Sequence, residues 1–145
     1  LVIAGIKELP QQYVGLPYIE YVGFLNKNTP EQYHRYVQLW KEATLFLLPT
    51  KAECAGIVFC EASAYGVPIF TYDTGGTGDY VIDGVNGYKL APSANAADFA
   101  ACIRRNLNTL SLQTLREGGL RLYKEKLSWS AWSRRFREIM EENGM

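Results

Sequence analysis

The sequence lacks the residue types on which several common kinds of site depend. It has one histidine, His34, which falls beside Arg35 off the apolar stripe of its helix, so we expect it on the surface. With no second histidine, neither a Ser-His-Asp triad nor a metal cluster is indicated. The three cysteines, Cys54, Cys60 and Cys102, have no Cys-x-x-Cys spacing, so neither a disulfide framework nor a zinc site is indicated. This usage favours a reducing compartment.

No apolar run approaches the roughly 20 residues of a spanning helix, and no signal peptide is visible. Fifteen Lys+Arg balance fifteen Asp+Glu, which argues against nucleic acid as the main partner. The balance is uneven, because the segment from Arg104 onward has nine basic and five acidic residues. That basic segment is either a solvated helix face or a surface attracted to an anionic membrane or partner. We expect a cytoplasmic protein, with peripheral contact to the inner face of a membrane as the alternative.

The 145 residues are 48% apolar and 13% aromatic, enough for one packed core. Short apolar runs alternate with helical patterns, which is typical of an α/β fold with a Rossmann-like parallel sheet flanked by helices. The predicted strands cover residues 1–4, 18–22, 45–48, 68–72 and 88–90. The chain begins at Leu1 inside an apolar run, without Met, so we interpret residues 1–145 as a fragment with a single domain.

Helical spacing predicts helices over residues 30–44, from 57, over 96–107, over 111–127 and from 129. Thr29 precedes Pro30 as the expected cap of the first helix, while Asn95 and Ser128 are expected to cap two later ones. Gly118 and its neighbour weaken the helix over 111–127. The three C-terminal helices should close the domain.

The last predicted helix carries an aromatic stripe. Trp129, Trp132 and Phe136 follow i, i+3, i+7 spacing, while three arginines face out. We expect the tryptophans to be core or interface anchors rather than a platform for stacking bases.

The residues with the clearest chemical meaning lie between Pro49 and Gly66. Gly56 lets the backbone turn from a strand into a helix near Ile57, and the free N–H groups at such a helix start suit a phosphate. Glu53 precedes this helix, and Glu61 lies inside its apolar sequence. Two carboxylates on either side of a helix start suit a ligand with a central diphosphate and hydroxyl-rich groups at both ends.

Other interpretations of these carboxylates remain open. Glu61 could lie on a narrow exposed stripe, and Glu53 could be a solvated loop residue. The pair could also be the acid and base of a glycosidase, which requires a separation of about 5 to 9.5 Å across a cleft. The helix start between them favours phosphate.

A second glycine-rich loop, residues 73–79, follows the predicted strand over 68–72. Gly75 and Gly76 permit close backbone approach, so this loop is either a tight structural turn or a nest of amides for an anion. Residues 79–82 are predicted as a short helix and residues 83–87 as a turn into the last strand.

These features occur in an order that resembles a known family. Their sequence closely resembles the C-terminal, donor-binding domain of family 4 (group 1) retaining glycosyltransferases with the GT-B fold, over essentially the whole chain. The resemblance rests on Pro49-Thr50, Glu53, Glu61-Ala62 after seven intervening residues, Gly66-Val67-Pro68, Gly75-Gly76, Asp83-Gly84, Asn86-Gly87 and Ser128-Trp129.

The resemblance implies a half-enzyme that holds a nucleotide-diphosphate sugar against an N-terminal acceptor domain. It implies that Glu61 binds ribose hydroxyls and that Glu53 positions the donor sugar, as the residue nearest to a catalytic role. It further implies donor contacts at Ala55, Gly56 and Ile57, a loop shaped by Gly75 and Gly76, and a base near Phe24 to Leu25. No metal, cofactor or protein nucleophile is expected, and the enzyme stabilises the departing diphosphate.

The sequence departs from the family in three places. The usual Glu-Gly-Phe-Gly is Glu53-Cys54-Ala55-Gly56, and Gly78-Asp79 replaces a common Pro-Glu pair. The family's first strand, followed by the Arg and Lys that neutralise the diphosphate, would lie upstream of Leu1.

Two hypotheses follow from the absent strand. The chain alone should not turn over a glycosyl donor. The sheet should also be completed, either by residues 1–4 pairing with residues 45–48 or by a strand from a partner or second copy. A non-catalytic module that binds sugar nucleotides or another protein is the alternative function.

Overall fold

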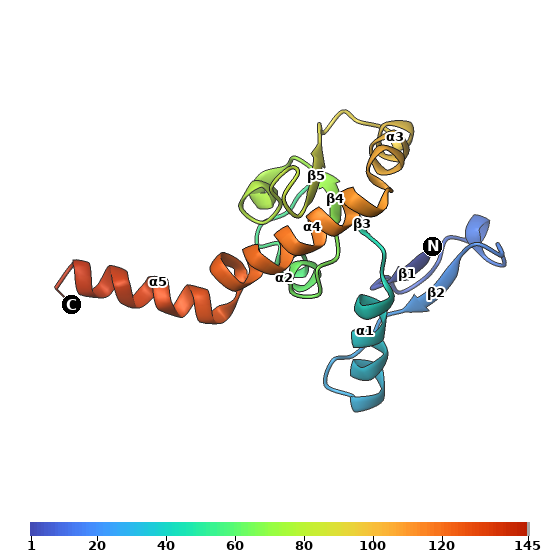
Figure 1. Cartoon of the computed structure of the whole chain (residues 1–145). Helices are drawn as coiled ribbons and strands as arrows, with labels where there is room; N and C mark the ends of the chain where they lie inside the picture. The colour runs from blue at the N-terminus through green and yellow to red at the C-terminus, as the bar shows by residue number, and fades with distance from the viewer. Residues whose placement is uncertain (145) are drawn as a thin grey trace. The chain divides into compact units, whose positions relative to one another are not determined.

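The computed structural model of the chain describes residues 1–144, and it divides into two compact units. Unit 1 comprises Leu1–Glu42 and unit 2 begins at Ala43. Both are built from parallel strands and helices, so the predicted α/β, Rossmann-like class is confirmed (Figure 1).

Unit 1 contains a two-stranded parallel sheet and one long helix. Strand β1 (Val2–Ala4) pairs with β2 (Glu20–Gly23), with Ile3 opposite Tyr21. A short 3₁₀ turn, η1 (Gln11–Tyr13), interrupts the connection between the strands. Helix α1 (Pro30–Glu42) begins at the proline, as predicted, and an ion pair between Arg35 and Glu20 links it to β2.

Unit 2 contains a three-stranded parallel sheet in the order β3-β4-β5. These strands are β3 (Phe46–Leu48), β4 (Ile69–Tyr72) and β5 (Gly87–Leu90). The central strand β4 is buried from Ile69 to Thr71, which explains its nearly continuous apolar sequence. The core of unit 2 therefore lies around β4 and the helix that precedes it.

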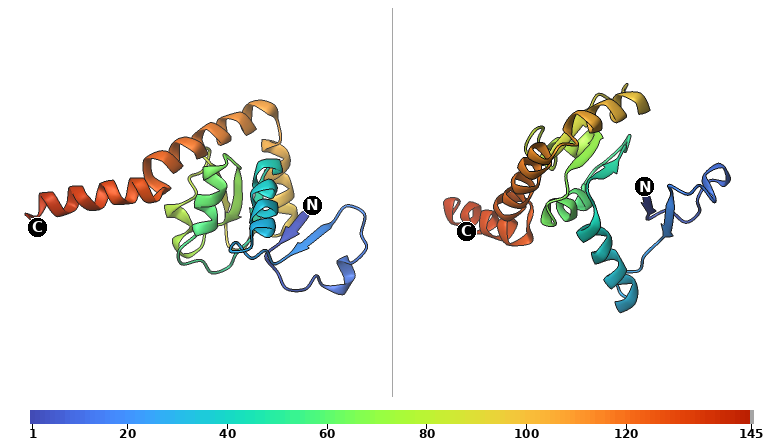
Figure 2. Two further views of the ribbon diagram at one scale, coloured as in Figure 1. Left: turned by 90° about the horizontal axis from the view of Figure 1, so that it is seen from below. Right: turned by 45° about the vertical axis from the view of Figure 1, so that its right-hand side comes forward.

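The helices of unit 2 are α2 (Ile57–Ala64), α3 (Ala96–Asn106), α4 (Thr109–Leu122) and α5 (Trp129–Glu142). A π-helical turn, η3 (Tyr123–Leu127), continues α4, and a 3₁₀ turn, η2 (Gly75–Asp79), follows β4. Helix α4 packs against α2, and the two lie side by side (Figures 1 and 2). Gly119 of α4 is buried near Ser63 of α2, whereas the buried Gly118 lies against the carbonyl oxygen of Val85.

Most of the predicted elements form where the sequence indicates. All five strands are confirmed within one or two residues. The Asn95 side chain accepts hydrogen bonds from the amides of Ala97 (2.8 Å) and Asp98 (3.3 Å), and Ser128 Oγ accepts from Ala131 N (3.1 Å). These two predicted caps are therefore confirmed.

The predicted short helix over residues 79–82 is wrong. The turn forms earlier, as η2, because Thr77 lies fully buried and its hydroxyl accepts a hydrogen bond from the amide of Thr74 (3.0 Å). Residues 80–82 are instead held by Asn86, whose Oδ1 accepts from Ile82 N (2.8 Å).

The expectation that α5 closes the domain as part of its core is also wrong. Helix α5 extends away from the body of unit 2, and it packs chiefly on η3 (Figure 2). Trp129 is 78% exposed and Trp132 is 56% exposed, although Trp132 stacks on Phe136 with ring centroids 5.3 Å apart. The aromatic stripe is thus preserved without being buried, whereas Ala131 of the same helix is 5% exposed. Its assignment as an interface anchor stays a prediction.

Direct pairing of residues 1–4 with residues 45–48 stays a prediction, because these residues belong to different units. Among the described residues, β1 pairs with β2 and β3 pairs with β4, in two separate sheets. β3 is an edge strand of its own sheet, so a strand from elsewhere could still pair with it.

Candidate functional site

The candidate site is built around the start of α2, where β3 leads through the loop of residues 49–56. Gly56 is buried directly before the helix, with Phe59 and Tyr80 against it. A Cβ at Gly56 would overlap the Phe59 ring and lie 3.1 Å from Tyr80 Cδ2, so only glycine fits without rearrangement. Ile57, the first residue of α2, is 64% exposed. The start of α2 is therefore open to a ligand on the side that Ile57 occupies, and its amides carry the positive end of the helix dipole.

Glu53 lies in this loop, ahead of the helix. Its side chain is half-buried, and Oε1 accepts a hydrogen bond from Cys54 N over 3.1 Å. Ala55, between Glu53 and the helix, is exposed. The carboxylate thus has one contact within its own loop and retains lone pairs for the hydroxyl groups of a ligand.

Glu61 lies one turn beyond Ile57. Residues four apart share a face of a helix, so Glu61 lies on the same face as the exposed Ile57, while Phe59, Ala62 and Ser63 face the core. Glu61 is half-buried. The sequence allows Glu61 either on a narrow exposed stripe or at a ligand. On α2 the exposed stripe and the face available to a ligand are the same surface.

The glycine-rich loop of residues 73–79 contacts the backbone of the loop that carries Glu53. The amide of Gly76 donates to the carbonyl oxygen of Glu53 (3.0 Å), and Thr74 Oγ1 donates to the carbonyl oxygen of Thr50 (3.2 Å). Gly75 has φ +50°, and a Cβ there would overlap the same Glu53 oxygen. The loop of residues 73–79 is thus a structural turn that packs against residues 50–54. The Gly76 amide already donates to Glu53 within the protein.

Two ionisable groups near this site, the Cys60 thiol and the Tyr80 phenol, have raised pKa values. Burial raises the pKa of the Cys60 thiol, and the nearby Glu61 carboxylate raises it further. The pKa of Tyr80 is raised by burial first and then by nearby groups that include Cys60, Cys54 and Glu53. Tyr80 is therefore a neutral phenol beside the loop that carries Glu53.

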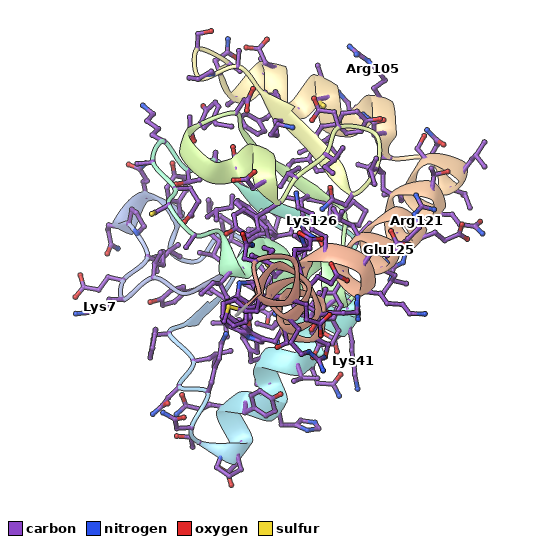
Figure 3. The ribbon with its side chains drawn as sticks, turned by 90° about the vertical axis from the view of Figure 1, so that its left-hand side faces the viewer. Lys7, Lys41, Arg105, Arg121, Glu125 and Lys126 are labelled. Atoms are coloured by element: carbon purple, nitrogen blue, oxygen red, sulfur yellow. The ribbon has the colours of Figure 1, made fainter. Side chains whose placement is uncertain are left out.

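Sequence reasoning missed three residues that shape this site, namely Thr74, Tyr80 and Asn86. Asn86 is 1% exposed, and its Nδ2 donates to Ser63 Oγ (3.1 Å) and to the carbonyl oxygen of Tyr80 (2.8 Å). The sequence places Asn86 in a turn and within the family resemblance, but nothing local indicates that its side chain reaches α2. The basic end of the chain also contributes, because Lys126 Nζ donates to the carbonyl oxygen of Asp79 (3.1 Å). Lys126 is labelled in Figure 3.

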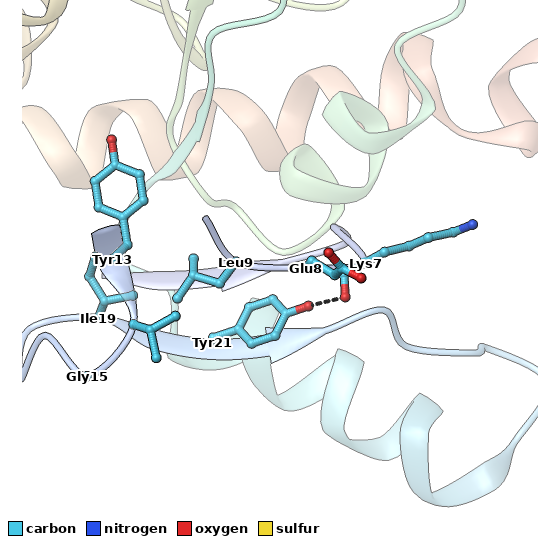
Figure 4. Close-up of a pocket in the computed structure, with 8 residues that line it drawn as sticks. Lys7, Glu8, Leu9, Tyr13, Gly15, Ile19 and Tyr21 are labelled. Atoms are coloured by element: carbon cyan, nitrogen blue, oxygen red, sulfur yellow. Dashed lines mark hydrogen bonds between the residues drawn. The ribbon is translucent and has the colours of Figure 1, made fainter. Parts of the chain in front are cut away.

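Unit 1 holds the segment for which the resemblance implies a base contact. Phe24, directly after β2, is 69% exposed, and Leu25 is half-buried. Unit 1 also has a hollow of about 430 Å³ lined by Lys7, Tyr13, Tyr21 and their neighbours (Figure 4). Tyr21 closes one side of it by donating to the carbonyl oxygen of Lys7 (2.6 Å).

Residues 1–144 bring together no group of three or more His, Cys, Asp and Glu side chains that could hold a metal. Within the same residues, no helix has both the length and the apolar character that crossing a membrane requires. His34 is exposed on α1, as predicted.

Comparison with known proteins gives consistent relatives. The chain is 30% identical over 114 residues to lipopolysaccharide 1,2-N-acetylglucosaminetransferase of Salmonella typhimurium, which covers 78% of this chain and 29% of the relative. It is 33% identical over 122 residues to D-inositol 3-phosphate glycosyltransferase of Nocardia farcinica, covering 84% of this chain and 26% of the relative. The chain thus spans less than a third of the length of these curated relatives.

Solved structures share the fold. Sucrose-phosphate synthase from Thermosynechococcus elongatus superposes with a TM-score of 0.76 at 21% identity, over 97% of this chain and 37% of that one. Anabaena HepE in complex with UDP-glucose superposes with a TM-score of 0.66 at 20% identity, over 90% of this chain and 34% of that one.

The family model described as glycosyl transferases group 1 matches residues 1–117. This match includes both carboxylates, the start of α2 and the glycine loop. The chain belongs to the group 1 glycosyl transferase family.

Proposed function

We propose that this chain is the donor-binding part of a retaining glycosyltransferase, which transfers a sugar from a nucleotide-diphosphate donor to an acceptor hydroxyl. The observation that carries the proposal is the position of Glu53 and Glu61, one before and one within the helix whose exposed start lies between them. The acceptor would belong to glycan, polysaccharide or glycolipid synthesis, and an N-terminal acceptor domain would supply most of its contacts.

In this proposal the start of α2 holds the diphosphate. The amides near Ala55, Gly56 and Ile57 and the helix dipole stabilise negative charge, which increases on the diphosphate as the glycosidic bond breaks. Glu61 accepts hydrogen bonds from ribose hydroxyls, and Glu53 accepts them from the sugar and so orients its anomeric carbon. The donor phosphate takes the proton of the acceptor hydroxyl, and no metal or other cofactor takes part.

The named relatives support this donor class. Among the solved structures of similar fold, Anabaena HepE was crystallised with UDP-glucose and the pneumococcal O-GlcNAc transferase GtfA with UDP and GlcNAc. The test is calorimetry of the chain against UDP, UDP-glucose, UDP-N-acetylglucosamine and their GDP counterparts, with free glucose as control. Binding of at least one nucleotide sugar, without binding of free glucose, supports the proposal. Failure of the whole panel contradicts it.

We further propose that residues 1–145 alone do not catalyse transfer, because they span less than a third of the length of the curated relatives. In the sheet that the described residues form, β3 pairs with β4, and its other edge would accept a strand from a partner or a second copy. Sedimentation velocity tests self-association, and a monomer over the whole concentration range contradicts it.

A cytoplasmic location with contact to an anionic surface is proposed from the C-terminal helices. Arg105 extends outward from the end of α3 (Figure 3). Helix α5 combines three arginines with exposed aromatic side chains. Co-sedimentation with phosphatidylglycerol vesicles, but not with phosphatidylcholine vesicles, is the expected result. Equal recovery with both would contradict it.

A further inference from the structure

We infer that Thr74 and Gly76 are positioning residues that fix Glu53 for the donor sugar. This inference rests on the proposed function and adds to it a specific role for η2 and the residue before it. The glycine loop would then act on the donor through the loop of residues 50–54 rather than by wrapping an anion with its own amides.

The first reason is that Glu53 has little support of its own. It lies between β3 and α2, in a segment with no helix or strand, and its carboxylate contacts the amide of the adjacent Cys54. The Thr50 hydroxyl donates to the carbonyl oxygen of Ala52 (2.8 Å), which tightens the start of the loop. Both contacts are local, so they cannot fix the loop against the rest of unit 2.

The second reason is that two hydrogen bonds from the glycine loop do fix it. Thr74 Oγ1 binds the Thr50 carbonyl at one end, and Gly76 N binds the Glu53 carbonyl three residues later. Thr74 is itself held by the buried Thr77 through the bond between Thr74 N and Thr77 Oγ1. The loop with Glu53 is therefore tied to a segment anchored in the core.

The third reason is steric. A Cβ at Gly76 would lie 2.7 Å from the carbonyl oxygen of Cys54, closer than real contacts allow, and a backbone oxygen cannot rotate away as a side chain can. At Gly78, two residues further on, a Cβ would have no heavy atom within 4 Å. Neither glycine has a positive φ. The variants Gly76→Ala and Gly78→Ala therefore differ in the contact with the Cys54 carbonyl oxygen and not in backbone strain.

A carboxylate that orients a sugar must be held within a fraction of an ångström, because small displacements of a reacting group reduce the rate steeply. Loss of either hydrogen bond, from Thr74 to Thr50 or from Gly76 to Glu53, should leave the start of α2 intact. Gly56 is fixed separately by its packing against Phe59 and Tyr80. Binding of the nucleotide should therefore survive while binding of the sugar weakens.

The experiment compares Gly76→Ala with Gly78→Ala and Thr74→Val with Thr74→Ser. Hydrogen exchange of the peptide over residues 50–56, without ligand, reports the loop, and calorimetry gives the affinities for UDP and for the best-binding UDP-sugar. We expect Gly76→Ala and Thr74→Val to raise exchange about fivefold or more, as loss of one hydrogen bond implies, with Gly78→Ala and Thr74→Ser unchanged. The gain in affinity from UDP to the UDP-sugar should shrink by a similar factor in the first pair only.

Equal exchange in Gly76→Ala and Gly78→Ala would overturn the inference whatever the ligand does. Faster exchange in Gly76→Ala and Thr74→Val, with an unchanged gain in affinity from UDP to the UDP-sugar, would also overturn the inference. Loosening of the loop of residues 50–54 would then have no effect on binding of the sugar. If the wild-type chain binds no nucleotide sugar, the proposed function fails with the positioning role, whereas the exchange data still show whether the ties exist. Thr74→Ser guards against misfolding, since it keeps the hydroxyl that Thr74→Val removes.

Discussion

Gly118 of α4 lies directly against the carbonyl oxygen of Val85, so close that a Cβ on this glycine would overlap the oxygen. Val85 belongs to the turn that leads into β5, so the contact joins α4 to the edge of the sheet. The glycine that weakens the helix as an isolated element therefore permits its packing. Local helix propensity and tertiary contact oppose each other at this position, and the structure favours the contact.

Gly118→Ala tests that relationship by the sign of its effect. Helix propensity alone predicts a gain of about 1 kcal/mol, whereas overlap with a backbone oxygen predicts a loss of about 1–3 kcal/mol. We expect a lower free energy of unfolding in urea titrations. Gly119→Ala is the matched control, because its Cβ would have ordinary contacts at 3.6 to 3.8 Å, and it should be neutral or stabilising. Stabilisation by both would contradict the account.

Asn86 should be among the most sensitive polar residues of unit 2. It is 1% exposed and connects Ile82, Tyr80 and Ser63 through its side-chain amide. Asn86→Ala leaves several buried partners unsatisfied, so we expect a loss of about 2–4 kcal/mol in the same urea titrations. Asn143→Ala, at an exposed position near the C-terminus, should change stability by less than about 0.5 kcal/mol. A similar small change at Asn86 would show that the connection is dispensable.

The two carboxylates should affect different parts of the donor. Glu61→Ala should weaken binding of UDP and of UDP-sugar alike, by about tenfold, since a hydrogen bond to a charged group contributes roughly 1.5–3 kcal/mol. Glu53→Ala should leave UDP unaffected and reduce the additional affinity that the sugar provides. Calorimetry measures both, with Glu117→Ala on the exposed face of α4 as the control. Unchanged UDP affinity in Glu61→Ala would refute its assignment.

The cysteines give a chemical test of the same surface. Cys54 is exposed beside Glu53, whereas burial, with Glu61 as the second cause, raises the pKa of Cys60 from its ordinary 9.0. A raised thiol pKa means less thiolate at neutral pH, so Cys54 should react with iodoacetamide before Cys60. Mass spectrometry of labelled peptides measures the order. A bound nucleotide sugar should slow labelling of Cys54, and faster labelling of Cys60 than of Cys54 would contradict the structure.

The same thiol gives a pH dependence of stability. The folded state raises the pKa of Cys60, so its stabilising contribution is complete below the ordinary thiol pKa of 9.0 and declines as pH rises above it. We expect the melting temperature to fall between pH 8 and about pH 10, and to fall less in Cys60→Ala relative to its own value at pH 8. Parallel curves for the two proteins would exclude Cys60 as a source of the decline.

Local sequence patterns predict much of this fold. The apolar runs ending at glycine, proline or polar clusters correspond to the five strands, and the side chains of Asn95 and Ser128 cap helices as their positions indicate. The start of α2 at Ile57, after Gly56, was also predicted, since a glycine between a strand and an apolar segment permits the tight turn.

What the sequence did not reveal depends on contacts between distant segments. The bond from Thr74 to Thr50 spans 24 positions and that from Asn86 to Ser63 spans 23, and neither has a local signature. The spacing of Trp129 and Trp132 predicts that they share one face of a helix, but it does not predict whether another element covers that face. In the structure both side chains are exposed.

In the proposed function, a nucleotide-diphosphate donor binds at the start of α2 between Glu53 and Glu61. Backbone amide NMR of the isotope-labelled chain, titrated with UDP-glucose, tests it most directly. We expect saturable shifts at Cys54 to Val58 and near Glu61, with smaller shifts in the loop of Gly75 and Gly76. Saturable shifts confined to other elements, or none at millimolar ligand, would contradict it.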